Sequence, residues 1–174
     1  VLRELLAARA VAVIRMKDPA RFAAVAAALR EGGVTAVEIT MTVPGAVGII
    51  REMARTKAPG TLVGAGTVLD AGTAAEVIAA GADFVVSPVF DRATVEACRE
   101  AGVIVAPGAF TPTEIVTAWR AGADVVKVFP ATSLGPQFFR DVRGPLPEVR
   151  LMPTGGVTVE NARDFLAAGA ALVG

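Results

Sequence analysis

The sequence predicts an α/β protein that folds as a single (β/α)8 TIM barrel, because short apolar runs alternate with helical segments along the chain. Eight such runs are rich in valine and isoleucine, as expected for strands buried on both faces of a parallel sheet. They cover residues 11–15, 34–40, 61–65, 83–86, 103–106, 124–129, 149–152 and 170–173. A doubly wound open sheet is the competing arrangement, but no G-x-G-x-x-G follows the first run to support it.

Helices are predicted between these runs by their stop and start signals. Glycines at 81, 102 and 122 stand where a helix end needs a left-handed backbone, and glycines at 32, 60 and 169 are expected to play the same part. Asp18 before Pro19 is a predicted N-cap, and further predicted caps are Asp91, Thr158, and two capping boxes, Thr73 with Glu76 and Thr111 with Glu114. Strands and helices that alternate in this way imply parallel strands with right-handed crossovers.

The length of 174 residues suits one domain, and we expect residues 1–174 to form a single barrel domain. The sequence ends at Gly174, directly after the eighth run, so the barrel is expected to be truncated after strand 8.

The composition excludes several kinds of chemistry. The chain has no histidine and one cysteine, so a Ser-His-Asp triad, a histidine-ligated metal site and an internal disulfide are ruled out. A net charge of +0 and few aromatic residues disfavour nucleic acid or an anionic membrane as a partner. No apolar run reaches the roughly 18 residues of a spanning helix, which leads us to expect a cytoplasmic protein.

Two charged residues stand inside apolar strands, which makes them the strongest catalytic candidates. Lys127 lies in "DVVKVFP", where burial would lower its pKa and leave a neutral amine that can attack a carbonyl carbon. Glu38 lies in "AVEIT", where a buried carboxyl could hold and pass on a proton. For Lys127, the alternative is a structural lysine that reaches solvent or is neutralised by a carboxylate. For Glu38, the alternative is a buried ion pair without a catalytic role.

Other candidates stand at the carboxyl ends of the predicted strands, where TIM barrels carry their active sites. Gly155 and Gly156, which follow Thr154 in "MPTGGVT", could bring backbone N–H groups to a phosphate, although a tight turn is the alternative. Arg15 could bind a carboxylate or phosphate or pair with Glu38. Thr67 in "GAGTV" offers a hydroxyl to an anion or structures its loop.

Taken in order, these motifs carry a family resemblance. The segments "VEITMTVPGA", "GAGTVLD", "SPVF", "APGAFTPTEI", "VKVFPATSLGPQFF" and "MPTGGVTVENARDFLAAGA" resemble the 2-keto-3-deoxy-6-phosphogluconate (KDPG) aldolase family over almost the whole chain. The family also contains 4-hydroxy-2-oxoglutarate (KHG) and 2-keto-3-deoxy-6-phosphogalactonate (KDPGal) aldolases. The resemblance implies a class I aldolase on a (β/α)8 barrel, with no cofactor and no metal, that assembles as a homotrimer.

The resemblance also implies roles for single residues. Lys127 matches the Schiff-base lysine and Glu38 the acid/base glutamate. Thr67 matches a threonine near the pyruvate carboxylate, and Arg15 a basic residue that lines the site. The remaining matches are Pro88 and Phe129 in the pyruvate pocket and Gly155 and Gly156 at the substrate phosphate, with Thr154 beside them.

Two departures from the family pattern concern anion binding. Some members carry an arginine four residues after the glutamate, where this chain has Thr42, so anion binding is expected to depend on Arg15. The family's loop after strand eight continues with a Gly-Ser pair that lies beyond the end of this sequence.

The function expected from the residues and the resemblance together is cleavage of KDPG to pyruvate and glyceraldehyde 3-phosphate. The alternative substrates are KHG and KDPGal, and the expected partners are a small 2-keto acid or its phosphate, and pyruvate. Two more distant alternatives are another phosphate-binding barrel enzyme, such as an isomerase or a synthase, and a barrel that binds a ligand without turnover.

Overall fold

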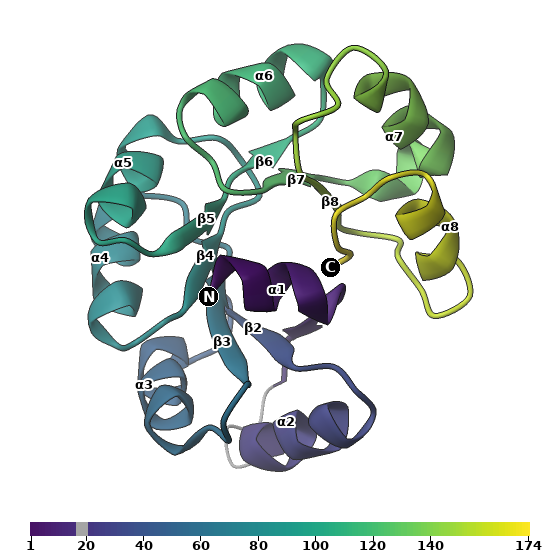
Figure 1. The fold of residues 1–174 in the computed structure, drawn as a ribbon. Helices are drawn as coiled ribbons and strands as arrows, with labels where there is room; N and C mark the ends of the chain where they lie inside the picture. The colour runs from purple at the N-terminus through teal and green to yellow at the C-terminus, as the bar shows by residue number, and fades with distance from the viewer. Residues whose placement is uncertain (17–20) are drawn as a thin grey trace.

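The computed structural model describes residues 1–16 and 21–174, whose strands form a ring surrounded by helices (Figure 1). The strands are β1 Val11–Ile14, β2 Ala36–Thr40, β3 Leu62–Gly66, β4 Phe84–Val86, β5 Ile104–Ala106, β6 Gly108–Ala109, β7 Val126–Val128 and β8 Leu151–Pro153. The helices are α1 Leu2–Ala8, α2 Phe22–Glu31, α3 Ala46–Thr56, α4 Ala71–Ala79, α5 Arg92–Glu100, α6 Pro112–Arg120, the 3-10 helix η2 Ala131–Ser133, α7 Gly135–Arg143 and α8 Ala162–Ala167. The predicted alternation of strands and helices is thus confirmed.

All strand pairs in the ring are parallel. One sheet has the order β1-β2-β3-β4-β5 and the other β6-β7-β8. The two sheets meet at Pro107, which directly follows the predicted fifth strand, residues 103–106, and separates β5 from β6; β6 was not predicted. This separation does not open the ring, because the carbonyl oxygens of Val105 and Pro107 accept hydrogen bonds from the backbone of Asp124 and Lys127.

The predicted eighth strand, 170–173, closes the ring through a few backbone hydrogen bonds. Val173 bridges Ala10 in parallel, and its carbonyl oxygen accepts a hydrogen bond of 2.8 Å from the Val11 N–H. On the other side, the Ala171 N–H donates to Leu151 at 2.9 Å. The segment therefore takes the place of an eighth barrel strand between β8 and β1, although it is too short and irregular to count as one.

The barrel is filled by one layer of apolar side chains and coated by another. The inner cluster combines Leu5 of α1 with residues of β1 to β5 and β8, with Val125 directly before β7, and with Leu172 of the closing segment: Val11, Ala36, Leu62, Phe84, Val86, Ala106, Val125, Met152 and Leu172. Figure 1 shows α1 across one end of the ring. Two outer clusters fill the space between strands and helices. Burial on both faces explains why the strands read as continuous apolar runs.

Two of the predicted helix caps are confirmed. The Asp91 carboxylate accepts a hydrogen bond from the Thr94 N–H at 2.8 Å, at the start of α5. Thr111 and Glu114 form the complete capping box at the start of α6. Both caps satisfy N–H groups that have no partner within their helix.

Two other predicted caps are wrong, and one lies outside the described residues. Helix α4 begins before Thr73, because Asp70 accepts from the Thr73 N–H at 2.8 Å and so caps the helix itself. Helix α8 begins at Ala162 behind Asn161, so Thr158 belongs to the preceding turn. Asp18 lies outside the described residues.

The glycines predicted at helix ends have the expected left-handed backbone in every case but one. Their φ angles are 96° at Gly81, 69° at Gly102 and 99° at Gly122, and those of glycines 60 and 169 are also positive. Gly32 has a φ of −77°, and its neighbour Gly33 takes the left-handed conformation with 88°. The sequence pair Gly-Gly did not reveal which glycine would turn the chain.

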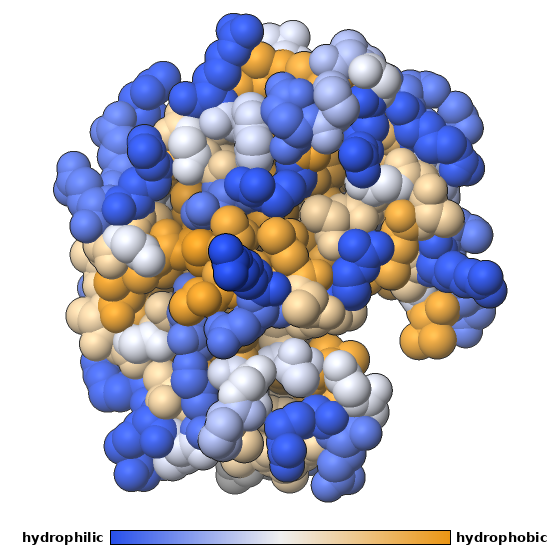
Figure 2. Space-filling model, in the orientation of Figure 1, coloured by the Kyte–Doolittle hydropathy of each residue, from blue (hydrophilic) through white to orange (hydrophobic). Residues whose placement is uncertain are grey.

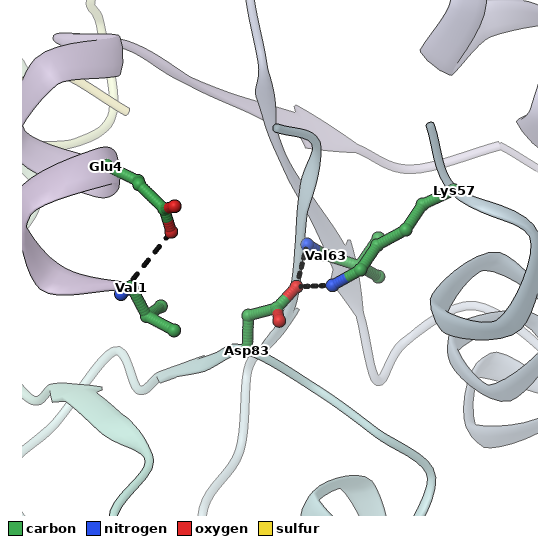
Figure 3. Close-up of polar contacts among 5 residues, drawn as sticks. All are labelled: Val1, Glu4, Lys57, Val63 and Asp83. Atoms are coloured by element: carbon green, nitrogen blue, oxygen red, sulfur yellow. Dashed lines mark hydrogen bonds and ion pairs between the residues drawn. The ribbon is translucent and has the colours of Figure 1, made fainter. Parts of the chain in front are cut away.

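The amino-terminal ends of the strands are held by polar contacts away from the predicted site. Asp83 accepts hydrogen bonds from the Lys57 ammonium and, at 2.7 Å, from the Val63 N–H at the start of β3 (Figure 3). Asp124 serves Val105 in the same way at 3.0 Å. We infer that this end of the barrel serves stability. Among the described residues, no helix is long and apolar enough to cross a membrane.

Candidate active site

Lys127 and Glu38 both point into the barrel. Lys127 alternates along β7 with Val126 and Val128, which belong to an outer cluster, while Val125 belongs to the inner one. In β2, Val37 and Ile39 lie in an outer cluster and Ala36 in the inner one, so Glu38 also faces inward. Side chains alternate between the two faces of a strand, and this alternation brings the two charged groups into one interior.

The Lys127 ammonium is buried and has no ion pair with any described residue. Its side chain is 3% exposed, and Nζ lies 4.8 Å from the centre of the Phe129 ring. Burial lowers the pKa of Lys127, the positive charge of Arg15 lowers it further, and the negative charge of Glu38 opposes both. A lowered pKa increases the fraction of neutral amine, which is the nucleophilic form.

Glu38 as a residue is 2% exposed and, like Lys127, has no ion pair among the residues that the structure describes. Burial raises the pKa of Glu38, while the positive charges of Lys127 and Arg15 oppose that rise. The two pKa values are shifted towards each other, which is the direction that favours proton exchange with a bound substrate.

A cavity of about 460 Å³ opens between β1 and the chain that follows β8. Lys127 and Glu38 are not among its lining residues, but it includes Phe129, whose ring lies next to Lys127 Nζ. Four predicted site groups line the cavity. They are Arg15, Phe129 and Thr154, which directly follow β1, β7 and β8 in the sequence, and the glycine pair 155–156. Val11, Val13 and residues at the start of α8 complete its wall. Figure 2 shows the molecular surface notched between the parts that α8 and α2 occupy in Figure 1.

The glycine pair has an unusual backbone that only glycine adopts readily. Gly155 and Gly156 have φ angles of 83° and 78°. A side chain at 156 would also collide with Thr132, whose Oγ1 would lie 2.5 Å from the added Cβ. The Asn161 side chain donates to the Gly156 carbonyl oxygen at 2.9 Å and so fixes the loop. Consecutive left-handed residues of this kind form turns that can present N–H groups to an anion.

Thr154, directly before this pair, carries a buried hydroxyl that lacks a protein partner. The residue is 5% exposed, and its Oγ1 makes no hydrogen bond in the described structure. An unpaired buried hydroxyl costs free energy unless a ligand or water satisfies it.

The other predicted site residues also follow strand ends. Thr67 comes directly after β3 and has a φ of 59°, a left-handed conformation that costs a β-branched residue free energy. Pro88 follows β4 and is half-buried. Thr42, in the position of the family's arginine, is exposed, and its hydroxyl lies 2.8 Å from that of the fully buried Thr40.

The sequence analysis missed Thr40 and Gly66 as neighbours of the site. Thr40 lies two residues after Glu38 and shares its inward face, so the period of two could have found it. Gly66 touches the Glu38 carboxyl from the adjacent strand, a contact that no sequence spacing reveals. The described residues hold no cluster of three or more His, Cys, Asp or Glu that could bind a metal.

Comparisons with known proteins show the family to which this chain is similar. The family model of KDPG and KHG aldolase matches residues 1–174. The 2-dehydro-3-deoxy-phosphogluconate aldolase of Pseudomonas aeruginosa is 38% identical over 161 residues, 92% of this chain and 73% of that protein. A probable 2-dehydro-3-deoxy-6-phosphogalactonate aldolase of Rhizobium meliloti is 35% identical over 160 residues, 91% of this chain and 76% of that protein.

A solved structure extends the comparison to the chemistry. The KDPG aldolase of Legionella pneumophila, with pyruvate captured as a covalent carbinolamine intermediate, has a TM-score of 0.91 at 30% identity and covers 99% of this chain and 84% of that one. A carbinolamine is the adduct of an amine and a carbonyl carbon, as expected for a class I aldolase. The chain therefore belongs to the KDPG and KHG aldolase family of class I aldolases, enzymes that cleave carbon–carbon bonds.

Proposed function

We propose that this protein cleaves KDPG to pyruvate and glyceraldehyde 3-phosphate, with Lys127 as the nucleophile and Glu38 as the acid/base. The observation that carries the proposal is a buried lysine without an ion pair beside a buried glutamate, both facing the barrel interior. Two groups with opposite pKa shifts in one apolar enclosure suit an imine mechanism.

The proposed cleavage begins with attack of the neutral Lys127 amine on the 2-keto carbon. Loss of water gives a protonated imine, which can accept the electrons of the C3–C4 bond. Glu38 takes the proton of the C4 hydroxyl, the C3–C4 bond breaks, and glyceraldehyde 3-phosphate leaves. Glu38 then returns the proton to the enamine carbon, and hydrolysis of the imine frees pyruvate and Lys127.

The lining of the cavity favours a phosphorylated substrate with more than one hydroxyl over KHG, which has one hydroxyl and no phosphate. Gly155 and Gly156 offer a backbone suited to phosphate, and the unpaired Thr154 hydroxyl could bind a hydroxyl of the substrate chain. Arg15 in the cavity wall adds a positive charge for an anionic group. The family resemblance assigns Thr67, Pro88 and Phe129 to the pyruvate end.

The first test traps the imine. Incubation with pyruvate and borohydride should give a reduced adduct that maps to Lys127, and the half-buried Lys57 serves as the internal control. The Lys127→Ala variant should lose the adduct and turnover together. An adduct on Lys57 alone, or turnover that survives in Lys127→Ala, would contradict the mechanism.

The second test chooses the substrate. Pyruvate release from KDPG, KDPGal and KHG is measured in parallel, and kcat/KM should be highest for KDPG. A Thr154→Val variant should lose the preference for KDPG over KHG, because it removes the free hydroxyl. A wild type that prefers KHG would refute the assignment.

We also infer that the protein assembles as a homotrimer. The loops that follow β3, β4 and β6 carry the exposed apolar side chains of Leu69, Val89 and Phe110. Burial of these side chains between copies of the chain would be favourable. Light scattering after size exclusion should give three times the chain mass. A monomer at micromolar concentration would contradict this inference.

A further inference from the structure

The Glu38 carboxyl rests on a strip of β3 that has no side chains. Glu38 pairs in register with Gly64, and Thr40 pairs with Gly66. Both glycines lie on the inner face of β3, because Val63 and Ala65, which alternate with them along the strand, lie in an outer cluster.

The contact with Gly66 is so close that a side chain at this position would displace the Glu38 carboxyl. A Cβ added to Gly66 would lie 1.8 Å from Glu38 Oε1, 2.4 Å from Cδ and 2.7 Å from Cγ. Real Cβ contacts below 3.0 Å essentially do not occur. The carboxyl of Glu38 therefore occupies the very space that a side chain at position 66 would fill.

Polar contacts with described residues do not fix the Glu38 carboxyl. No ion pair joins it to Lys127 or to Arg15, and no described side chain or backbone group donates a hydrogen bond to it. Its place beside Lys127 therefore depends on the packing of the barrel interior.

We propose that Gly66 is a positioning residue for the reaction: its missing side chain leaves the space that holds the Glu38 carboxyl beside Lys127. This inference rests on the proposed function, in which Glu38 moves protons to and from the substrate bound on Lys127. An alanine at 66 would push the carboxyl away by more than about 1 Å, and a misplacement of that size can cost about 100-fold in rate. Lys127 stands on β7, away from β3, so imine formation should survive.

Pyruvate alone separates the two steps. Lys127 forms the imine with C2 and releases water, which borohydride trapping reports. Glu38 then removes a proton from C3 to give the enamine and returns a deuteron in D2O, which proton NMR of the pyruvate methyl group reports. In Gly66→Ala we expect exchange to slow about 100-fold while trapping stays within about twofold of the wild type.

Gly64→Ala is the matched control. It adds the same carbon to the same face of the same strand, but this carbon meets the buried Phe84 ring at 2.2 Å instead of Glu38. A general disturbance of β3 should therefore lower the melting temperature of Gly64→Ala at least as much, with exchange and trapping reduced together. Equal loss of exchange and trapping in Gly66→Ala would assign Gly66 a structural role only and overturn the proposal.

A shortened acid gives a second test. In a Glu38→Asp background the carboxyl no longer reaches over Gly66, so Gly66→Ala should slow exchange less than about tenfold further. The same 100-fold effect in both backgrounds, or wild-type exchange in Gly66→Ala, would refute the proposal. A wild type that gives no trapped adduct would instead overturn the proposed function itself.

Discussion

Replacing Lys127 with methionine should abolish activity and yet stabilise the fold. Lys127 is 3% exposed and has no ion pair among the described residues, so folding removes most of the side chain from water without giving the amine a charged partner. Burial of an unpaired polar group costs roughly 1–3 kcal/mol in mutational data. Methionine fills a similar volume with no charge to bury. In a chain of 174 residues, 1 kcal/mol corresponds to about 2–4 °C in Tm, so Lys127→Met should raise Tm by roughly 2–12 °C.

The pH dependence of this gain follows from the lowered pKa. Between the lowered pKa of Lys127 in the folded state and the ordinary value of 10.5, the unfolded chain binds more protons than the folded one. Stability of the wild type with respect to this group therefore rises with pH across that window. Lys127→Met lacks the group, so its advantage in Tm should shrink as the pH rises towards 10.5.

Calorimetry of both proteins from neutral to alkaline pH measures the effect. The control is Lys57→Met, which removes the partner of Asp83 and should cost on the order of 1 kcal/mol. A Lys127→Met variant that is less stable than the wild type at neutral pH would refute the reasoning. An advantage that grows with pH would refute it as well.

Two further predictions concern the charges and the glycine loop. Arg15→Gln removes a positive charge that lowers the pKa of Lys127, so the midpoint of borohydride trapping should move to higher pH. Glu38→Gln removes a negative charge that raises this pKa, so the midpoint should move to lower pH. Midpoints that move in the same direction would show that these charges do not control the amine. Gly156→Ala should lower Tm by roughly 2–8 °C, because its left-handed backbone costs about 1–2 kcal/mol with a Cβ and that Cβ lies 2.5 Å from Thr132 Oγ1. The same variant should raise KM for KDPG more than the half-saturating concentration for pyruvate trapping, and equal rises would place the loop away from the phosphate.

The alternation of strands and helices could be predicted because each signal is local. Runs of valine and isoleucine between helix-ending glycines specify buried parallel strands, and the capping box at Thr111 and Glu114 specifies a helix start within four residues. Element boundaries were less predictable. At α4 the N-cap is Asp70 and not Thr73. Both residue types are good caps, and the choice between them depends on how the loop after β3 enters the helix.

The site residues that could be predicted from the sequence are those whose charge differs from their apolar sequence neighbours. Lys127 and Glu38 stand out because an ionisable group in an apolar strand costs free energy, and such costly groups cluster at functional sites. Thr154 and Thr67 do not stand out in this way. The unpaired hydroxyl of one and the left-handed backbone of the other emerge only when the chain is folded.

The sequence by itself determined the strand order, the inward direction of Lys127 and Glu38, and the family, since all three depend on spacing along the chain. Only the tertiary structure decided how the ring closes through Val173, how Pro107 separates β5 from β6 without opening the barrel, and which atoms touch the Glu38 carboxyl. The physical reason is that packing contacts join residues from different strands. The distance between Gly66 and the Glu38 carboxyl is set by the register of β2 against β3 and by side-chain packing, and neither is encoded in any local pattern.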